Sequence, residues 1–242
     1  MAEEQHQIST SASQCKHLAK QPRFGFPILL ICLVLILLLP SYFDQPLMGG
    51  LVLSVLLSVL LLSALYLVAY QLRELLTGIA IAIPVMLALW WNALLPEPWG
   101  VYVANGLYLL FICYIGLLIG RFLFETDRIS LDMIIASVCL YLLIGLLWAF
   151  IYQMIEVGSS GSFRFVEVEA SLMEPVRHML SQFTYYSYVT LSTLGYGDIT
   201  PVTRLARSWA VLETLAGQFY LAVVIARLVG LYITRRDNDA SS

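Results

Sequence analysis

The chain has 242 residues, of which 60% are hydrophobic and only 12% charged, and its formal net charge is −3. Soluble domains carry about 25% charged residues, so this composition excludes an ordinary soluble protein and indicates one that lies in a lipid bilayer. The small net charge, together with the absence of a basic block or a nucleic-acid-binding motif, argues against a nucleic-acid partner.

Cysteine and histidine are sparse and scattered along the chain. No two cysteines have CxxC spacing, and three of the four lie in apolar segments, so they are expected to be reduced packing residues. The three histidines have neither i,i+4 pairing nor a neighbouring Cys or Asp. No structural metal and no cofactor are therefore predicted.

Six apolar segments are near the length of about 20 residues that crosses the hydrocarbon core as a helix. They are residues 26–43, 47–70, 75–95, 101–124, 131–156 and 205–233. The polar residues 1–25 precede the first segment and no small-residue cleavage site follows it, so it is not predicted to be a signal peptide. The pattern predicts an all-α, multi-pass membrane protein with six transmembrane helices.

The stretch between the fifth and sixth segments has a different character. Residues 157–177 are polar and rich in Gly, Ser and Glu, which is typical of a loop. Residues 178–193 are aromatic and rich in hydroxyl groups, so we expect a re-entrant helix shielded by protein. Four carboxylates outnumber the arginines of the loop and predict either a mildly negative outer mouth or merely a solvated loop: Glu156, Glu167, Glu169 and Glu174.

The distribution of charge between the segments predicts orientation, because Lys and Arg accumulate on the cytoplasmic side of a membrane. Two loops on one side carry only acidic residues, Asp44 and Glu97. On the same side, Arg164, Arg177, Arg204 and Arg207 lie around the loop after the fifth segment, where they are expected to be local to a folded region. The loops on the other side and the two ends carry Lys16, Lys20, Arg23, Arg73, Arg121, Arg128, Arg235 and Arg236. Both termini are therefore predicted to be cytoplasmic in a protein of the cell membrane, and the loop after the fifth segment is predicted to open to the outside.

The most informative motif is TLSTLGYGD at residues 190–198. It resembles the signature of potassium channels, T-V-G-Y-G followed by an acidic residue, and it occurs after an aromatic helix and between two apolar spans. The resemblance is to the tetrameric potassium channel family, and more narrowly to bacterial six-helix members with a two-helix pore domain. It implies a homotetramer in the lipid bilayer with K⁺ as the permeant ion.

The resemblance implies an extended selectivity filter from Thr193 to Gly197. K⁺ would be held by oxygens of Thr193, Leu194, Gly195 and Tyr196, with Leu194 standing where the family usually has Val. Gly195 and Gly197 lack a Cβ and can adopt the positive φ that aims successive carbonyls at one axis. The side chain of Tyr196 is expected to point away from the pore, into a collar of aromatic side chains.

Residues on both sides of the filter are expected to support it. Tyr185 and Tyr186 lie where the family commonly has two tryptophans, and one of their hydroxyl groups is expected to bond Asp198. Glu213 is an acid near the middle of the last span, where charge is expensive. It is expected either to brace the pore helix through Thr190 or Ser192, or to line the cavity and attract K⁺.

The last span resembles the pore-lining inner helix of the family. Gly217 lies 19 residues after Asp198, which is the spacing of the hinge that lets this helix bend open, although a helix-packing glycine is the alternative. Ala222 would be the small residue at the intracellular constriction, and Gly230 is a weaker hinge candidate. Arg227 is expected to be an interfacial residue that snorkels.

The first four spans lack the pattern of a voltage sensor, because the only basic residue of the fourth is Arg121. One terminal arginine does not supply the several gating charges that steep voltage dependence needs. The predicted domains are a cytoplasmic arm (1–25), a four-helix bundle resembling a degenerate voltage sensor (26–128), the pore domain (129–236) and a short cytoplasmic tail (237–242). No soluble ligand-binding domain is expected on this chain.

Three other functions are alternatives to a K⁺ channel. A weakly selective cation pore is disfavoured because its relatives usually lose the filter tyrosine. A potassium-uptake transporter subunit would carry four filter-like loops in one chain, and this sequence has one. An intramembrane enzyme would need a constellation such as Ser with His or paired Asp within the spans, and none is present.

Overall fold

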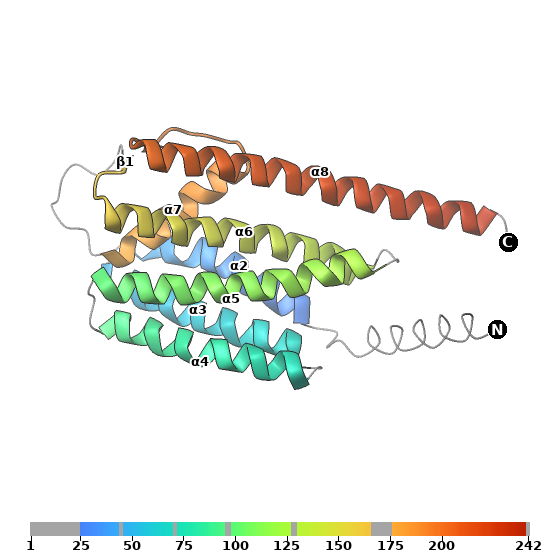
Figure 1. Ribbon diagram of the computed structural model, residues 1–242, viewed down its shortest axis with the longest axis horizontal. Helices are drawn as coiled ribbons and strands as arrows, with labels where there is room; N and C mark the ends of the chain where they lie inside the picture. Colours follow the sequence, from blue (N-terminus) through green and yellow to red (C-terminus); the bar gives the residue numbers. More distant parts are fainter. Residues whose placement is uncertain are drawn as a thin grey trace.

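A computed structural model describes residues 25–43, 46–69, 72–94, 98–126, 130–165 and 176–240 (Figure 1). Most of the predicted N-terminal arm, the acidic residues Glu167, Glu169 and Glu174, and the last two residues of the predicted tail lie outside this part of the chain. The elements are α2 (Gly25–Leu38), η1 (Leu39–Tyr42), α3 (Pro46–Val68), α4 (Leu72–Leu94), α5 (Pro98–Glu125), α6 (Leu131–Gly158), β1 (Phe163–Phe165), α7 (Val176–Leu191), β2 (Ile199–Pro201) and α8 (Arg204–Ala240).

Long apolar helices dominate the structure because a helix satisfies all interior backbone hydrogen bonds within one segment. Within the described ranges, five helices are long and apolar enough to cross a membrane: α3, α4, α5, α6 and α8. The first predicted span does not form one long helix. It divides into the 14-residue α2 and the 3₁₀ turn η1, where Pro40 interrupts the α-helical hydrogen bonds. At the other end, α8 continues past the predicted boundary at residue 233 to Ala240.

Helix α6 is the centre of the packing. It contacts α5 on one side and α2 on another, while α4 packs on α5 and α3 packs on α2. One hydrophobic core therefore runs from α2 to α8, and Phe150 and Tyr152 of α6 are fully buried in it. Helix α8 lies along α6 and extends beyond the other helices, and it ends at the end of the molecule where α2 begins (Figure 1).

Polar contacts between apolar helices fix their alignment. The Asn105 side chain of α5 donates a hydrogen bond to Oε1 of Gln153 in α6 at 2.9 Å, and both residues are buried. The Tyr114 hydroxyl of α5 bonds Oε2 of Glu74 in α4 at 2.9 Å. Because an unpaired polar group in hydrocarbon is costly, each such pair favours one register between its two helices.

Helix α7 crosses only part of the molecule, and it lies close to α6 (Figure 1). The Ser187 hydroxyl donates to the carbonyl of Gly145 at 2.7 Å, and the Tyr188 hydroxyl donates to that of Leu142 at 2.7 Å. The ring of Tyr188 occupies the space that a Cβ at Gly145 would need. Glycine at position 145 is therefore a condition for this close approach of α7 to α6.

The loop that follows α6 is tied to the segment that precedes α8. Strands β1 and β2 pair antiparallel, with Arg164 opposite Thr200. The carboxylate of Glu156 accepts hydrogen bonds from the backbone N–H groups of Gly161 at 2.7 Å and Phe163 at 3.0 Å. Glu156 is buried, so it is not the solvated loop residue of the second expectation: its carboxylate organises the turn before β1.

Replacing Gly145 by Ala is expected to force the Tyr188 ring away from α6 and to destabilise the fold by about 1–3 kcal/mol, as overpacking commonly does. Gly120→Ala is the matched control, since a Cβ at Gly120 meets no atom within 4 Å. Thermal unfolding in detergent measures both variants. A melting temperature lowered equally by both substitutions, or by neither, would contradict the packing argument.

Candidate functional site

The segment between α7 and β2 has an unusual backbone. After α7 ends at Leu191, the N–H of Leu194 donates to the carbonyl of Val189 at 2.9 Å, and no regular element resumes until Ile199. This segment returns to the end of the molecule at which α8 begins (Figure 1). The dihedral φ is +62° at Thr193, +59° at Gly195 and +83° at Gly197.

Positive φ thus recurs at every second residue from 193 to 197. Alternation of the two senses of φ turns successive peptide groups toward one side, instead of toward opposite sides as in a strand. The two glycines adopt it without a steric cost, as the sequence predicted. Thr193 was not predicted to share it, and for this β-branched residue the conformation costs about 1–2 kcal/mol.

The side chains of this segment do not pack against their own chain. Leu194 is 59% exposed and Tyr196 is 68% exposed. The aromatic collar predicted around Tyr196 is therefore not supplied by the described residues of the same chain.

One of the two predicted tyrosines bonds the acid after the filter. The Tyr185 hydroxyl donates to Oδ2 of Asp198 at 2.6 Å, and Oδ1 of Asp198 accepts from the N–H of Ile199 at 3.0 Å. Tyr186 instead points into the core, where its ring packs edge-on against Tyr152 and Phe163. Tyr185 thus fixes the start of β2, and Tyr186 packs on the interior face of α7.

Thr190 and Ser192 make local contacts at the end of α7. The Thr190 carbonyl accepts a hydrogen bond from the N–H of Thr193 at 3.0 Å, and the Ser192 hydroxyl donates to the carbonyl of Tyr188 at 2.6 Å. These bonds join the last turn of α7 to the segment that follows it. Neither residue contacts Glu213, so the partners predicted for that acid are wrong.

Glu213 is buried between three helices. Its Oε1 lies 2.5 Å from the Ser187 hydroxyl of α7, and its Oε2 lies 2.5 Å from the Tyr152 hydroxyl of α6. The side chain is 0% exposed, which excludes the predicted alternative that it lines an open cavity. The sequence could not rank Ser187 above the other serines and threonines of α7, which are Ser181, Thr184 and Thr190.

The number of hydroxyl protons in this cluster favours a protonated Glu213 carboxyl. Ser187 has a single hydroxyl proton, but its Oγ lies within hydrogen-bond distance of both Gly145 O and Glu213 Oε1. All groups are satisfied when the Glu213 carboxyl is protonated. It then donates to Ser187, Ser187 donates to Gly145, and Tyr152 donates to Glu213. This chain of hydrogen bonds links α8 to α7 and α7 to α6.

Gly217 lies one helical turn further along α8, against the end of α7. A Cβ at Gly217 would lie 2.6 Å from the Leu191 carbonyl oxygen, whereas a Cβ at Gly230 meets nothing within 4 Å. The packing role that the sequence left open for Gly217 is therefore supported by geometry. Helix α8 is continuous through Gly217, and Ala222 is exposed in the single chain.

No group of three His, Cys, Asp or Glu residues that could hold a metal ion occurs in the described ranges. The oxygen-rich features of this region are instead backbone carbonyls of the 193–197 segment. Oxygen ligands without thiolate or imidazole groups suit hard cations rather than transition metals.

Replacing Glu213 by Gln is expected to keep the cluster, because the amide N–H donates to Ser187 and the amide oxygen accepts from Tyr152. Glu213→Ala removes both contacts and leaves the Tyr152 hydroxyl buried and unpaired, at about 1–3 kcal/mol, whereas Ser187 keeps its bond to the Gly145 carbonyl. Thermal unfolding of the two variants tests this expectation. A Gln variant as destabilised as the Ala variant would show that a carboxylate, not a neutral acid, holds the cluster.

Comparison with known proteins agrees with this geometry. A family model described as "Ion channel" matches residues 138–233, which include α7, the 193–197 segment and most of α8. Two curated relatives called "Protein LctB", from Bacillus caldotenax and Geobacillus stearothermophilus, are each 35% identical over 104 residues. Each alignment covers 43% of this chain and 75% of the relative. The mostly helical chain, with several helices able to span a bilayer, is thus a multi-pass membrane protein that belongs to this ion channel family.

Proposed function

We propose that the chain is one subunit of a homotetrameric channel that conducts K⁺ passively and selectively across the cell membrane. The observation that carries the proposal is the alternation of positive φ from Thr193 to Gly197 in a segment that reads TLGYG. Such a backbone presents consecutive carbonyl oxygens to one side, which is what a dehydrated K⁺ ion needs in place of its water shell.

One chain supplies only one wall of such a pathway. A ring of carbonyls around an ion needs several identical strands about one axis, and closed cyclic symmetry provides them. Helix α7 is then the re-entrant pore helix, α6 the outer helix and α8 the inner helix that lines the pore. The open side chains of Leu194 and Tyr196 would be covered by neighbouring subunits, which would complete the aromatic collar.

The supporting residues keep the strand in place. Tyr185 and Asp198 hold the outer end of the filter, and Thr190 and Ser192 hold its inner end. Glu213 braces α7 from α8 through Ser187. We assign Gly217 as the point at which α8 bends, in addition to its packing role, and Ala222 as the constriction at the intracellular end.

The basic residues favour an orientation with both termini in the cytoplasm. Arg73 of α4, Arg121 of α5 and Arg235 and Arg236 of α8 belong to helix ends at the end of the molecule where α8 ends (Figure 1). The opposite end, with β1 and the filter segment, carries Arg164, Arg204 and Arg207, which we read as local to the folded pore mouth. We therefore place that opposite end outside the cell. With Arg121 as the only basic residue of α5, the channel is not strongly voltage-gated.

A weakly selective cation channel is the nearest alternative, and the presence of Tyr196 in the filter disfavours it. A potassium-uptake transporter subunit is an alternative from another class, and the single TLGYG segment of the sequence disfavours it. All three candidates are transport proteins. Ion selectivity and the number of subunits are the two properties that distinguish them.

Replacing Gly197 by Ala is expected to reduce K⁺ uptake into liposomes at least about tenfold, because a Cβ penalises φ of +83° by about 1–2 kcal/mol in each of four strands. Gly106→Ala is the control, because Gly106 lies in α5, outside the proposed pore domain, and a Cβ there meets no atom within 4 Å. The wild type should take up K⁺ but not Na⁺. Equal uptake of both ions, or a Gly197→Ala variant that conducts like the wild type, would refute the filter assignment.

The oligomeric state is a separate prediction. Native mass spectrometry in a mild detergent should give a complex of four chains of 27.1 kDa. Because one chain offers one filter strand, a monomer or dimer cannot close the ring. Purified protein that conducts ions while it contains fewer than four chains would contradict the proposed assembly.

A further inference from the structure

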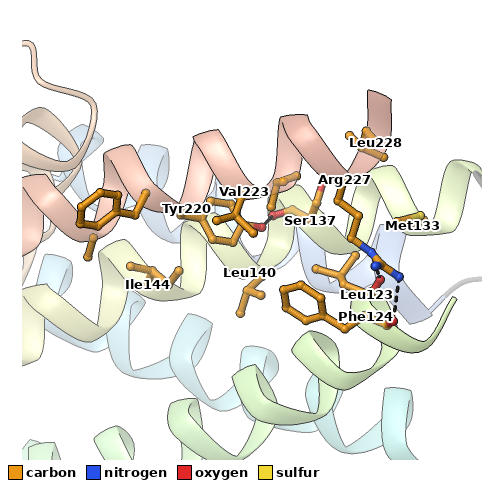
Figure 2. Close-up of a pocket in the computed structure, with 13 residues that line it drawn as sticks. Leu123, Phe124, Met133, Ser137, Leu140, Ile144, Tyr220, Val223, Arg227 and Leu228 are labelled. Carbon is orange, nitrogen blue, oxygen red and sulfur yellow. Dashed lines mark hydrogen bonds between the residues drawn. The ribbon is translucent and has the colours of Figure 1, made fainter. Parts of the chain in front are cut away.

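Arg227 makes a contact that its place in an apolar helix does not suggest. Its guanidinium group reaches from α8 to the C-terminal end of α5 (Figure 2). Nε donates to the carbonyl of Leu123 at 2.8 Å, and Nη2 donates to those of Phe124 at 2.7 Å and Thr126 at 3.1 Å. The guanidinium also lies over the Phe124 ring, 5.3 Å from its centroid. Beyond the interfacial position expected for Arg227, its guanidinium thus has specific partners on a neighbouring helix.

The contact is favourable for a simple reason. The last four carbonyl groups of an α-helix lack partners within the helix and carry partial negative charge. Helix α5 ends at Glu125, so the three carbonyls that Arg227 binds belong to this unpaired end or follow it directly. A planar guanidinium with several donors serves such a cluster better than an ammonium group does. Arg227 thus caps a helix that is distant from it in the sequence.

Beyond the Arg227 contact, the C-terminal half of α8 is loosely packed in the single chain. A cavity of about 310 Å³ lies between α8, α6 and the end of α5. Its lining is apolar apart from Ser137, Tyr220 and Arg227. Above the cavity, the Tyr220 hydroxyl bonds the Ser137 carbonyl at 2.5 Å (Figure 2). In the single chain, the bonds of Tyr220 and Arg227 therefore supplement the limited side-chain packing of α8 here.

We propose that Arg227 is a latch that fastens the intracellular half of α8 to α5 and thereby holds the pore closed. The proposal rests on the proposed function, in which α8 lines the pore and bends at Gly217 to open it. While α8 is straight, as it is here, the latch is engaged. Release of Arg227 from the α5 carbonyls then becomes a necessary step of opening.

The geometry makes the latch sensitive to bending. Arg227 lies ten residues beyond Gly217, which is about 15 Å along a helix at 1.5 Å per residue. A bend of about 20° at Gly217 would therefore displace Arg227 by about 5 Å. Hydrogen bonds of 2.7–3.1 Å do not survive such a displacement unless α5 moves together with α8. Movement of the first four helices could consequently reach the pore through this contact.

The test uses the full-length protein and three variants. Arg227→Gln removes the charge and the fork of donors. Arg227→Lys keeps the charge but has a single nitrogen, which cannot reproduce the two nitrogens that serve the three carbonyls. Arg121→Gln is the matched control, because it removes one exposed arginine from the same end of α5 and leaves the latch in place.

Two measurements are made on each variant: K⁺ uptake into liposomes and backbone hydrogen exchange of the peptide covering the end of α5. We expect Arg227→Gln to raise the uptake rate about fivefold or more, the lower end of typical coupling between sites. It should also speed exchange near Thr126, whose amide bonds the Phe122 carbonyl at 3.2 Å in the last turn. Arg227→Lys should be intermediate in both measurements, and Arg121→Gln should match the wild type.

Other outcomes would contradict different parts of the proposal. Unchanged or lower uptake in Arg227→Gln would show that Arg227 does not hold the pore closed, and unchanged exchange would show that it does not cap α5. Full wild-type behaviour of Arg227→Lys would assign the effect to charge alone. A wild type that carries no K⁺ refutes the proposed function instead, and hydrogen exchange then still reports whether Arg227 caps α5.

Discussion

The position of the filter segment depends on how closely the end of α7 approaches α6 and α8. Two glycines permit that approach, Gly145 beneath the ring of Tyr188 and Gly217 beneath the Leu191 carbonyl. The hydrogen bonds of Ser187 to Gly145 and Glu213 then fix the depth and rotation of α7. Because the 193–197 segment begins two residues after α7 ends, any shift of the helix would be passed directly to the carbonyls that follow.

The two ends of the protein are stabilised differently. Near the filter, buried acids are fully engaged: Glu156 binds two backbone N–H groups, and Glu213 joins three helices. Toward the other end, α8 borders an apolar cavity, and Arg227 bonds the carbonyls of α5. The proposed function would use both features, with rigid support for the 193–197 segment and freedom of movement for α8.

Much of this arrangement was predictable because it follows from local composition. Apolar length gave five of the predicted spans to within a few residues, and the hydroxyl-rich character of residues 178–193 predicted the short helix α7. The ability of Gly195 and Gly197 to adopt positive φ follows from their missing Cβ. The partners of Glu213, the burial of Glu156 and the reach of Arg227 were not predictable. They depend on which faces of helices that are distant in the sequence pack together. Because polar residues lie on several faces of these helices, the sequence is compatible with more than one packing arrangement.

The central claim is that the backbone of residues 193–197 selects K⁺ in a complete assembly. The most direct measurement is the reversal potential of the purified protein in a planar bilayer with equal concentrations of K⁺ on one side and Na⁺ on the other. The account predicts a large reversal potential with the sign of K⁺ permeation, because carbonyl rings spaced for K⁺ do not replace the hydration shell of Na⁺ equally well. A reversal potential near zero in channels that conduct would contradict the claim.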